Sequence, residues 1–156
     1  MNETKLTYHG EVEIIIRSKT GKLLKKKKHN AGTAKLQEIF AKALVGKYNN
    51  TYIPSYVSLD KSLDSGQLIT EPISGLVYST SDPSHPYPHV KLTAFIPYID
   101  SIGQANYLSL RSSDKSQLAY LSLTNSGITS LSQGQSMIVN WYLYVSLDTP
   151  VIQEEN

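Results

Sequence analysis

Apolar and polar residues alternate along residues 6–17, which predicts a β-strand with one face buried in a core. Gly21 follows, a residue that can adopt the positive φ of a tight turn, and residues 22–29 then read as a second strand. We therefore expect an N-terminal β-hairpin over residues 6–29. Its expected core face holds Val12, Ile14 and Ile16.

The pattern then changes to apolar residues spaced three and four apart, which predicts an amphipathic helix at about residues 33–46. Thr33 is a suitable N-cap, and Gly46 is expected to end the helix. The apolar stripe should lie against a sheet, and it consists of Leu36, Ile39, Phe40, Ala43 and Leu44.

After the helix the pattern returns to short β-strands separated by turn residues. Pro54 in the first of them suggests a sheet edge or a β-bulge. In the last strand, alternate positions predict a core face of Val139, Trp141, Leu143 and Val145. The expected strands cover residues 51–59, 90–97, 107–110, 118–124 and 137–147.

Residues 60–89 hold four of the seven prolines among serines and glycines, so we expect a surface loop region there, with a strand at residues 75–80. The polar tail, residues 149–156, is expected to be loose. Together the elements predict a mainly β fold in one domain, residues 1–156. We expect an antiparallel β-sandwich or jelly-roll-like barrel with one amphipathic helix after the hairpin.

The composition limits the class of protein. A chain of 156 residues is long enough for one domain with its own core. It has no cysteine, so disulfides and thiolate chemistry are excluded. No apolar run approaches the roughly 20 residues that cross a bilayer, and the N-terminus lacks the apolar stretch of a signal peptide. We therefore expect no membrane contact and synthesis in a cytoplasm.

The charge is distributed unevenly along the chain. Residues 1–50 hold 11 lysine and arginine residues against 4 acidic ones, whereas residues 51–156 hold 4 against 9. The densest basic feature is the hairpin return strand, with Lys22, Lys25, Lys26, Lys27 and Lys28. One interpretation is a surface that docks onto an acidic partner. The other is a solvated edge strand, whose lysines prevent pairing with other sheets.

The sequence offers few candidates for chemistry. His85 and His89 are four residues apart, but Pro86 and Pro88 exclude the helix that would bring them together on one face, so we expect a solvated loop instead of a metal site. Asp60 and the nearby Asp64 lack the ligand spacing of a calcium loop and are expected to be surface carboxylates. No glycine-rich phosphate loop is present. We therefore predict no cofactor, no metal, no catalytic residues and no enzymatic activity.

Tyrosine is over-represented, with eleven residues against two phenylalanines and one tryptophan. Tyrosine is favoured where one end of the ring is buried and the other is wet, as at subunit interfaces and sugar-binding platforms. Tyr78, Tyr87 and Tyr98 lie in or beside the loop region and are the candidates for an exposed recognition surface.

Two segments carry a resemblance. The first runs from Asn30-Ala31-Gly32-Thr33 through the helix to Ile53-Pro54-Ser55-Tyr56-Val57-Ser58-Leu59, and the second runs from Leu131 to Leu143, where Trp141 stands. They resemble the "N-A-G" turn, the "P-x-Y-I/V-x-L" strand and the "G-x-x-L-x-V-x-W-x-L" closing strand of small β-sandwich virion proteins of tailed bacteriophages. Met137 and the dense lysine run depart from that pattern.

The resemblance implies a non-enzymatic structural component of a virion, in a tail, a baseplate or a head decoration, assembled in the host cytoplasm in multiple copies. Its partners would be other virion proteins and further copies of the chain. A glycan-binding module that recognises a host surface polymer through loop tyrosines is the alternative. A basic-hairpin nucleic-acid binder is the third hypothesis; because no aromatic residues interleave with the lysines, we do not expect nucleic acid as the partner.

Overall fold

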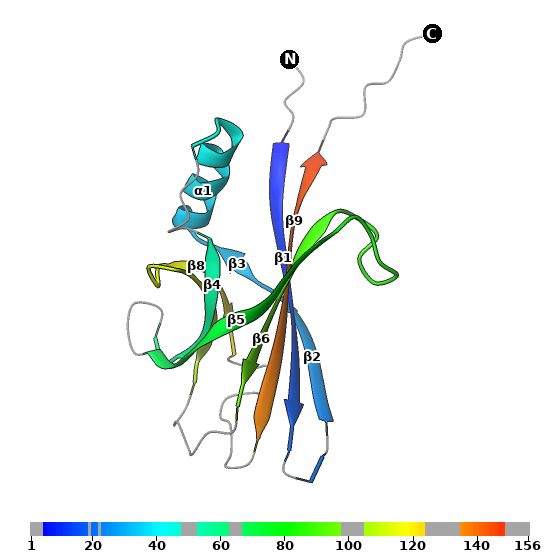
Figure 1. The fold of residues 1–156 in the computed structure, drawn as a ribbon, viewed down its shortest axis with the longest axis vertical. Coiled ribbons are helices and arrows are strands. Elements are labelled where there is room, and N and C mark those ends of the chain that lie inside the picture. Colours follow the sequence, from blue (N-terminus) through cyan, green and yellow to red (C-terminus); the bar gives the residue numbers. More distant parts are fainter. Residues whose placement is uncertain are drawn as a thin grey trace.

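The computed structural model describes residues 5–18, 20–21, 23–47, 53–62, 67–97, 105–123 and 135–148. Within these ranges the chain forms nine strands and one helix (Figure 1). The elements are β1 (Lys5–Arg17), β2 (Leu23–His29), β3 (Ala31–Gly32), α1 (Ala34–Leu44), β4 (Pro54–Asp60), β5 (Gln67–Ser79), β6 (His89–Ile96), β7 (Tyr107–Ser112), β8 (Gln117–Ser122) and β9 (Ser136–Asp148).

The described strands form one antiparallel sheet in the order β2-β1-β9-β6-β5-β4-β7-β8-β3. β5 connects two parts of this sheet. Its residues up to Pro72 pair with β4, and its residues from Ile73 onward pair with β6. The long strands β1 and β9 run side by side through the middle of the molecule (Figure 1). The mainly β, antiparallel architecture with one helix is confirmed, and the two faces that pack together belong to a single curled sheet.

The two ends of the sheet order are consecutive in the chain, because Asn30 alone separates β2 from β3. The Asn30 amide donates to the Gly10 carbonyl at 3.1 Å, and the Trp141 indole nitrogen donates to Asn30 Oδ1 at 3.1 Å. A Cβ on Gly10 would lie 1.6 Å from Asn30 Oδ1, so glycine at this point of β1 leaves the room that the Asn30 side chain occupies. At Asn30 the chain therefore passes from pairing with β1, at His29, to pairing with β8, at Ala31.

The core lies on the concave face of the curled sheet. Val12, Ile14 and Ile16 of β1 are buried, and so are Val139 and Trp141 of β9, which confirms the predicted core faces over these residues. Further buried apolar side chains come from the other strands: Val57, Leu59, Leu92, Ala94, Ile96, Leu108, Leu110, Ala119 and Leu121. Alternation in the sequence therefore identified the inner face of the sheet.

The helix forms where the sequence predicted it. The Thr33 hydroxyl accepts from the Leu36 amide at 3.4 Å, and Gly46 has a φ of +73° just after the helix. The prediction that the whole apolar stripe is buried was wrong. Leu36 is buried, whereas Phe40 is 36% exposed and Leu44 is 74% exposed. α1 contacts the sheet through its first turn near β8, and its C-terminal half extends past the short strands (Figure 1).

The loop region is smaller than predicted, because β5 begins at Gln67. Pro72 lies where β5 changes partners from β4 to β6, a position where a missing amide hydrogen costs little. The predicted irregularity at Pro54 is confirmed as a register shift between Pro54 and Tyr56. Among the described residues, no helix is long and apolar enough to cross a membrane.

Candidate functional site

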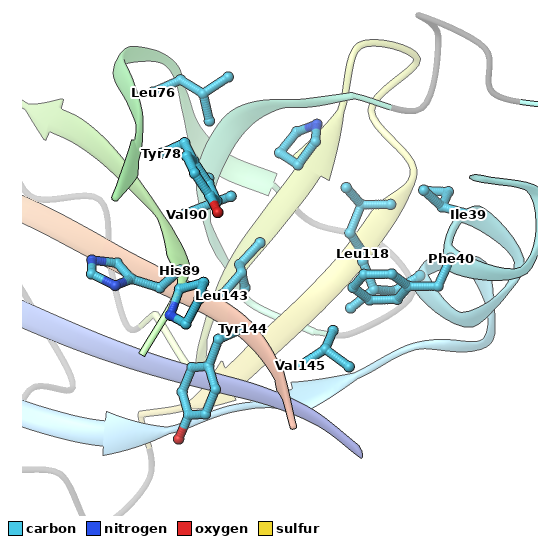
Figure 2. A pocket seen from close by; sticks show the side chains of 13 residues that line it. Ile39, Phe40, Leu76, Tyr78, His89, Val90, Leu118, Leu143, Tyr144 and Val145 are labelled. Atoms are coloured by element: carbon cyan, nitrogen blue, oxygen red, sulfur yellow. The ribbon is translucent and has the colours of Figure 1, made fainter. Parts of the chain in front are cut away.

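An apolar groove of about 600 Å³ lies between α1 and the ends of the long strands (Figure 2). In Figure 2, Ile39 and Phe40 approach it from α1, while Leu76 and Tyr78 approach it from β5 on the opposite side. The lining residues are Leu36, Ile39, Phe40, Pro54, Leu76, Tyr78, Pro88, His89, Val90, Leu118, Leu143, Tyr144 and Val145.

The groove exists because the strands differ in length. β1, β5 and β9 have 13 residues each, whereas β4, β7 and β8 have six or seven. The predicted core face of β9 therefore divides: Trp141 is fully buried, Leu143 is half-buried, and Val145 is 40% exposed. Within the described part of the chain, no strand lies opposite the outer end of this core face, and α1 covers it only in part.

The groove offers contact surface and little chemistry. None of the lining residues is an aspartate, glutamate, lysine or arginine, and His89 is the one titratable base among them. Such a lining can bury apolar groups of a partner, and its volume lies in the range of about 300–1,000 Å³ that is typical of ligand pockets. Of the lining residues, the sequence named Tyr78 as a recognition candidate, but it did not indicate the groove. The available signal was the run Leu76-Val77-Tyr78, where three consecutive apolar residues are each more than half exposed.

The segment Asp82–His89 packs against the outer face of β9. The His85 ring stacks on Tyr142 with centroids 3.9 Å apart, and Tyr87 lies 3.9 Å from the Tyr144 ring. His85 and His89 are 2% and 3% exposed, so the prediction of a solvated loop was wrong. Aromatic stacking on β9 removes these side chains from water, a long-range contact that the local sequence does not reveal.

Both ring nitrogens of His89 lie within hydrogen-bonding distance of an oxygen atom. Its Nδ1 lies 2.9 Å from the Tyr87 carbonyl oxygen, and its Nε2 lies 3.2 Å from Asp82 Oδ2. His85 Nε2 lies 3.4 Å from Glu11 Oε1, and its Nδ1 has no hydrogen-bond partner in the described part of the chain.

Asp82 links the two histidines electrostatically. Burial works to raise the pKa of the Asp82 carboxyl, but the amides of His85 and Ser84 and the positive charge of the two histidines outweigh that effect. The pKa of Asp82 therefore lies below its ordinary value. Burial, followed by the contact with Tyr144, raises the pKa of the Tyr87 phenol. The described residues contain no group of three or more histidine or acidic side chains arranged to hold a metal ion.

Asp60 is also not a surface carboxylate, and this expectation was wrong. It is the last residue of β4 and is fully buried. Its Oδ2 accepts from Arg111 at 2.9 Å and from Ser109 at 2.5 Å, and its Oδ1 accepts from Ser58 at 2.7 Å. The ion pair and its hydrogen bonds join β4 to β7, which is a structural role. Asp64 lies outside the described residues.

The candidate interaction residues do not form one surface. Lys25, Lys26, Lys27 and Lys28 belong to β2, at the edge of the described sheet, where an edge strand was predicted. Their side chains, and Lys22 and Tyr98 altogether, lie outside the described residues. Tyr78 is 67% exposed at the groove, whereas Tyr87 is half-buried against Tyr144. The docking, edge-strand and recognition hypotheses for these residues stay predictions.

Comparison with known proteins gives no relative: no family model, no curated protein and no solved structure matches the chain.

Proposed function

We propose that the protein is a non-enzymatic structural subunit that assembles with other proteins by burying the apolar groove. The groove carries this proposal, because a core face left partly open costs stability that a partner would restore on binding. The setting we propose is the virion of a tailed bacteriophage, with several copies on a capsid or tail, put together in the host cytoplasm. That setting rests on the resemblance of two segments of the sequence.

The contact between Asn30 and Trp141 supports treating the two resembling segments as one structural unit. Asn30 opens the "N-A-G" turn and Trp141 stands in the closing strand, 111 residues away. Their hydrogen bond joins the segment between β2 and β3 to β9, so the two motifs are in contact in the fold. A scaffold fixed in this way can present α1 and the groove to a neighbouring subunit.

A glycan-binding module remains the second candidate function, and the 67% exposure of Tyr78 is the observation that favours it. The partner in that case is a host surface polysaccharide. Tyr78 stands among aliphatic side chains of the groove, a lining that suits a polypeptide better than a sugar, which needs several hydrogen-bonding groups.

Incorporation into particles tests the proposed function. Phe40→Asp places a charge on the α1 wall of the groove, and we expect it to reduce incorporation while lowering the melting temperature by only a few degrees. The matched control is Phe95→Lys, because Phe95 is half exposed and does not line the groove. If Phe40→Asp assembles as efficiently as the control, the groove is not the interface.

Salt separates the groove from the lysine run as the attachment surface. At about 1 M ionic strength the screening length falls to about 3 Å, so an attachment through Lys25–Lys28 should loosen. An attachment through the apolar groove should persist, because burial of apolar surface does not depend on charge. Two results together would contradict the groove proposal. The chain would be released from particles in high salt, and it would no longer be incorporated when the four lysines are replaced by glutamine.

A further inference from the structure

Several strands of the described sheet have a free edge along part or all of their length, and two of them, β2 and β5, differ in their side chains. β2 pairs with β1 alone and carries four consecutive lysines. The second half of β5 pairs with β6, and within the described residues no strand lies along its other edge. From Ile73 to Thr80 this edge has no charged residue and no proline. Natural proteins protect free edges with such residues, so β2 is protected against strand addition and β5 is not.

The unprotected edge of β5 borders the groove. Leu76 and Tyr78 line the groove, and Leu76 lies in register with the buried Leu92 of β6, on the core side of the sheet. Val77, which alternates with them, is 57% exposed on the other face. A strand added to this edge would direct every second side chain into the groove (Figure 2).

The charges of the site limit what the occupant can be. The lining provides no acidic or basic partner apart from His89, whose two nitrogens already face Tyr87 and Asp82. A charged side chain entering the groove would be desolvated without a counterion. The side chains that the occupant directs into the groove are therefore uncharged.

We propose that the groove receives an extended segment of a partner polypeptide, which pairs with the free edge of β5 at Gly75–Ser79 and places alternate apolar side chains between β5 and α1. This inference rests on the proposed function and names the form of the partner at the same site. Backbone hydrogen bonds supply affinity, and the groove selects apolar residues at alternate positions.

Three blocked synthetic peptides test the proposal against the purified full chain. The first has a five-residue core in which valine alternates with threonine, flanked on each side by glycine and lysine for solubility. The second has the same side chains with alternate core amides N-methylated, which removes strand pairing. The third replaces each valine by serine. We expect the first to bind, and each change to weaken binding by about tenfold or more.

Hydrogen exchange supplies the second readout. Binding of the first peptide should slow amide exchange in residues 75–79. Val77→Lys alters the β5 edge without lining the groove, so it should weaken peptide binding, whereas the control Phe95→Lys should not. If the N-methylated peptide binds equally well, the inference is overturned while the groove remains a docking site. Absence of binding at millimolar concentration also overturns it. A third outcome would also overturn the proposal: the purified chain forms a dimer that Val77→Lys dissociates and that the peptide does not disrupt. The occupant of the β5 edge would then be a second copy of this chain and not a segment of another protein.

Discussion

The close approach of Asn30 to Gly10 predicts a strong coupling between these two positions. Gly10→Ala would put a methyl group 1.6 Å from Asn30 Oδ1, so the Asn30 side chain must leave its position. The Trp141 indole N–H, fully buried, would then lose its acceptor. An unsatisfied buried donor costs about 1–3 kcal/mol, and the crowding adds about 1–3 kcal/mol. We expect Gly10→Ala to lower the free energy of unfolding by about 2–6 kcal/mol.

Asn30→Ala removes the acceptor directly and makes room above Gly10. Alone it should cost about 1–3 kcal/mol, the cost of the orphaned indole N–H. In the Asn30→Ala background, Gly10→Ala should cost less than about 1 kcal/mol, because the group that it would strike is absent. The double-mutant cycle should thus give a coupling energy above about 1 kcal/mol.

Urea unfolding measures the four variants, and Trp141, the single tryptophan of the chain, reports the transition by its fluorescence. The native emission also tests the geometry, since the indole should respond when its hydrogen bond to Asn30 is removed. Equal costs of Gly10→Ala in both backgrounds would show that the approach of Asn30 does not constrain Gly10. The account of how Asn30 is held between Gly10 and Trp141 would then be wrong.

Three further predictions follow from burial and charge. Trp141→Ala should lower the free energy of unfolding by about 3–5 kcal/mol, and Phe40→Ala by only about 1 kcal/mol, because Phe40 is 36% exposed. Circular dichroism during urea unfolding measures both, and equal costs would place α1 deeper in the core. Asp60→Asn should lower the free energy of unfolding by about 3–5 kcal/mol, because it leaves Arg111 unpaired, and by much less in an Arg111→Met background. If urea unfolding shows that the effects of the two substitutions add, the ion pair is refuted. Since the Asp82 pKa is lowered by folding, its carboxylate stabilises the protein above the unfolded-state pKa of about 4, and this contribution is lost as the pH falls through the folded-state pKa. The difference in melting temperature between wild type and Asp82→Asn should therefore narrow from pH 5 to pH 2. A difference that stays constant over this range would contradict a stabilising role of the Asp82 carboxylate.

Local patterns predicted the elements because the forces that form them are local. The alternation in β1 identified Val12 and Ile14 as core residues, and the hydroxyl of Thr33 predicted the start of α1. Gly21 and Gly46 adopt positive φ, as expected of residues that end a strand and a helix. Each of these predictions required knowledge of only a few neighbouring residues.

Predictions that depended on distant contacts failed. The prolines around His85 and His89 correctly excluded a helix, but the surface that buries these histidines is contributed by Tyr142 of β9, more than fifty residues away. Asp60 was expected to be a surface carboxylate in the loop region that begins after the strand at residues 51–59, but it is buried, and its partner Arg111 comes from β7. Pairing of this kind follows from sheet order, which the alternation of residues along one strand does not determine.

The failure at α1 differs in kind, because the apolar stripe was identified correctly and only its partner was missing. Leu36 meets β8 and is buried, while Phe40 stands opposite the open ends of β5 and β9. Alternation in β9 likewise continues through Leu143 to Val145, past the point where an opposing strand ends. In both α1 and β9, the apolar pattern of a core face therefore continues past the buried core. These two elements form the walls of a site that another chain can complete. The uncharged edge of β5 between those walls is what favours an extended segment as that completing element.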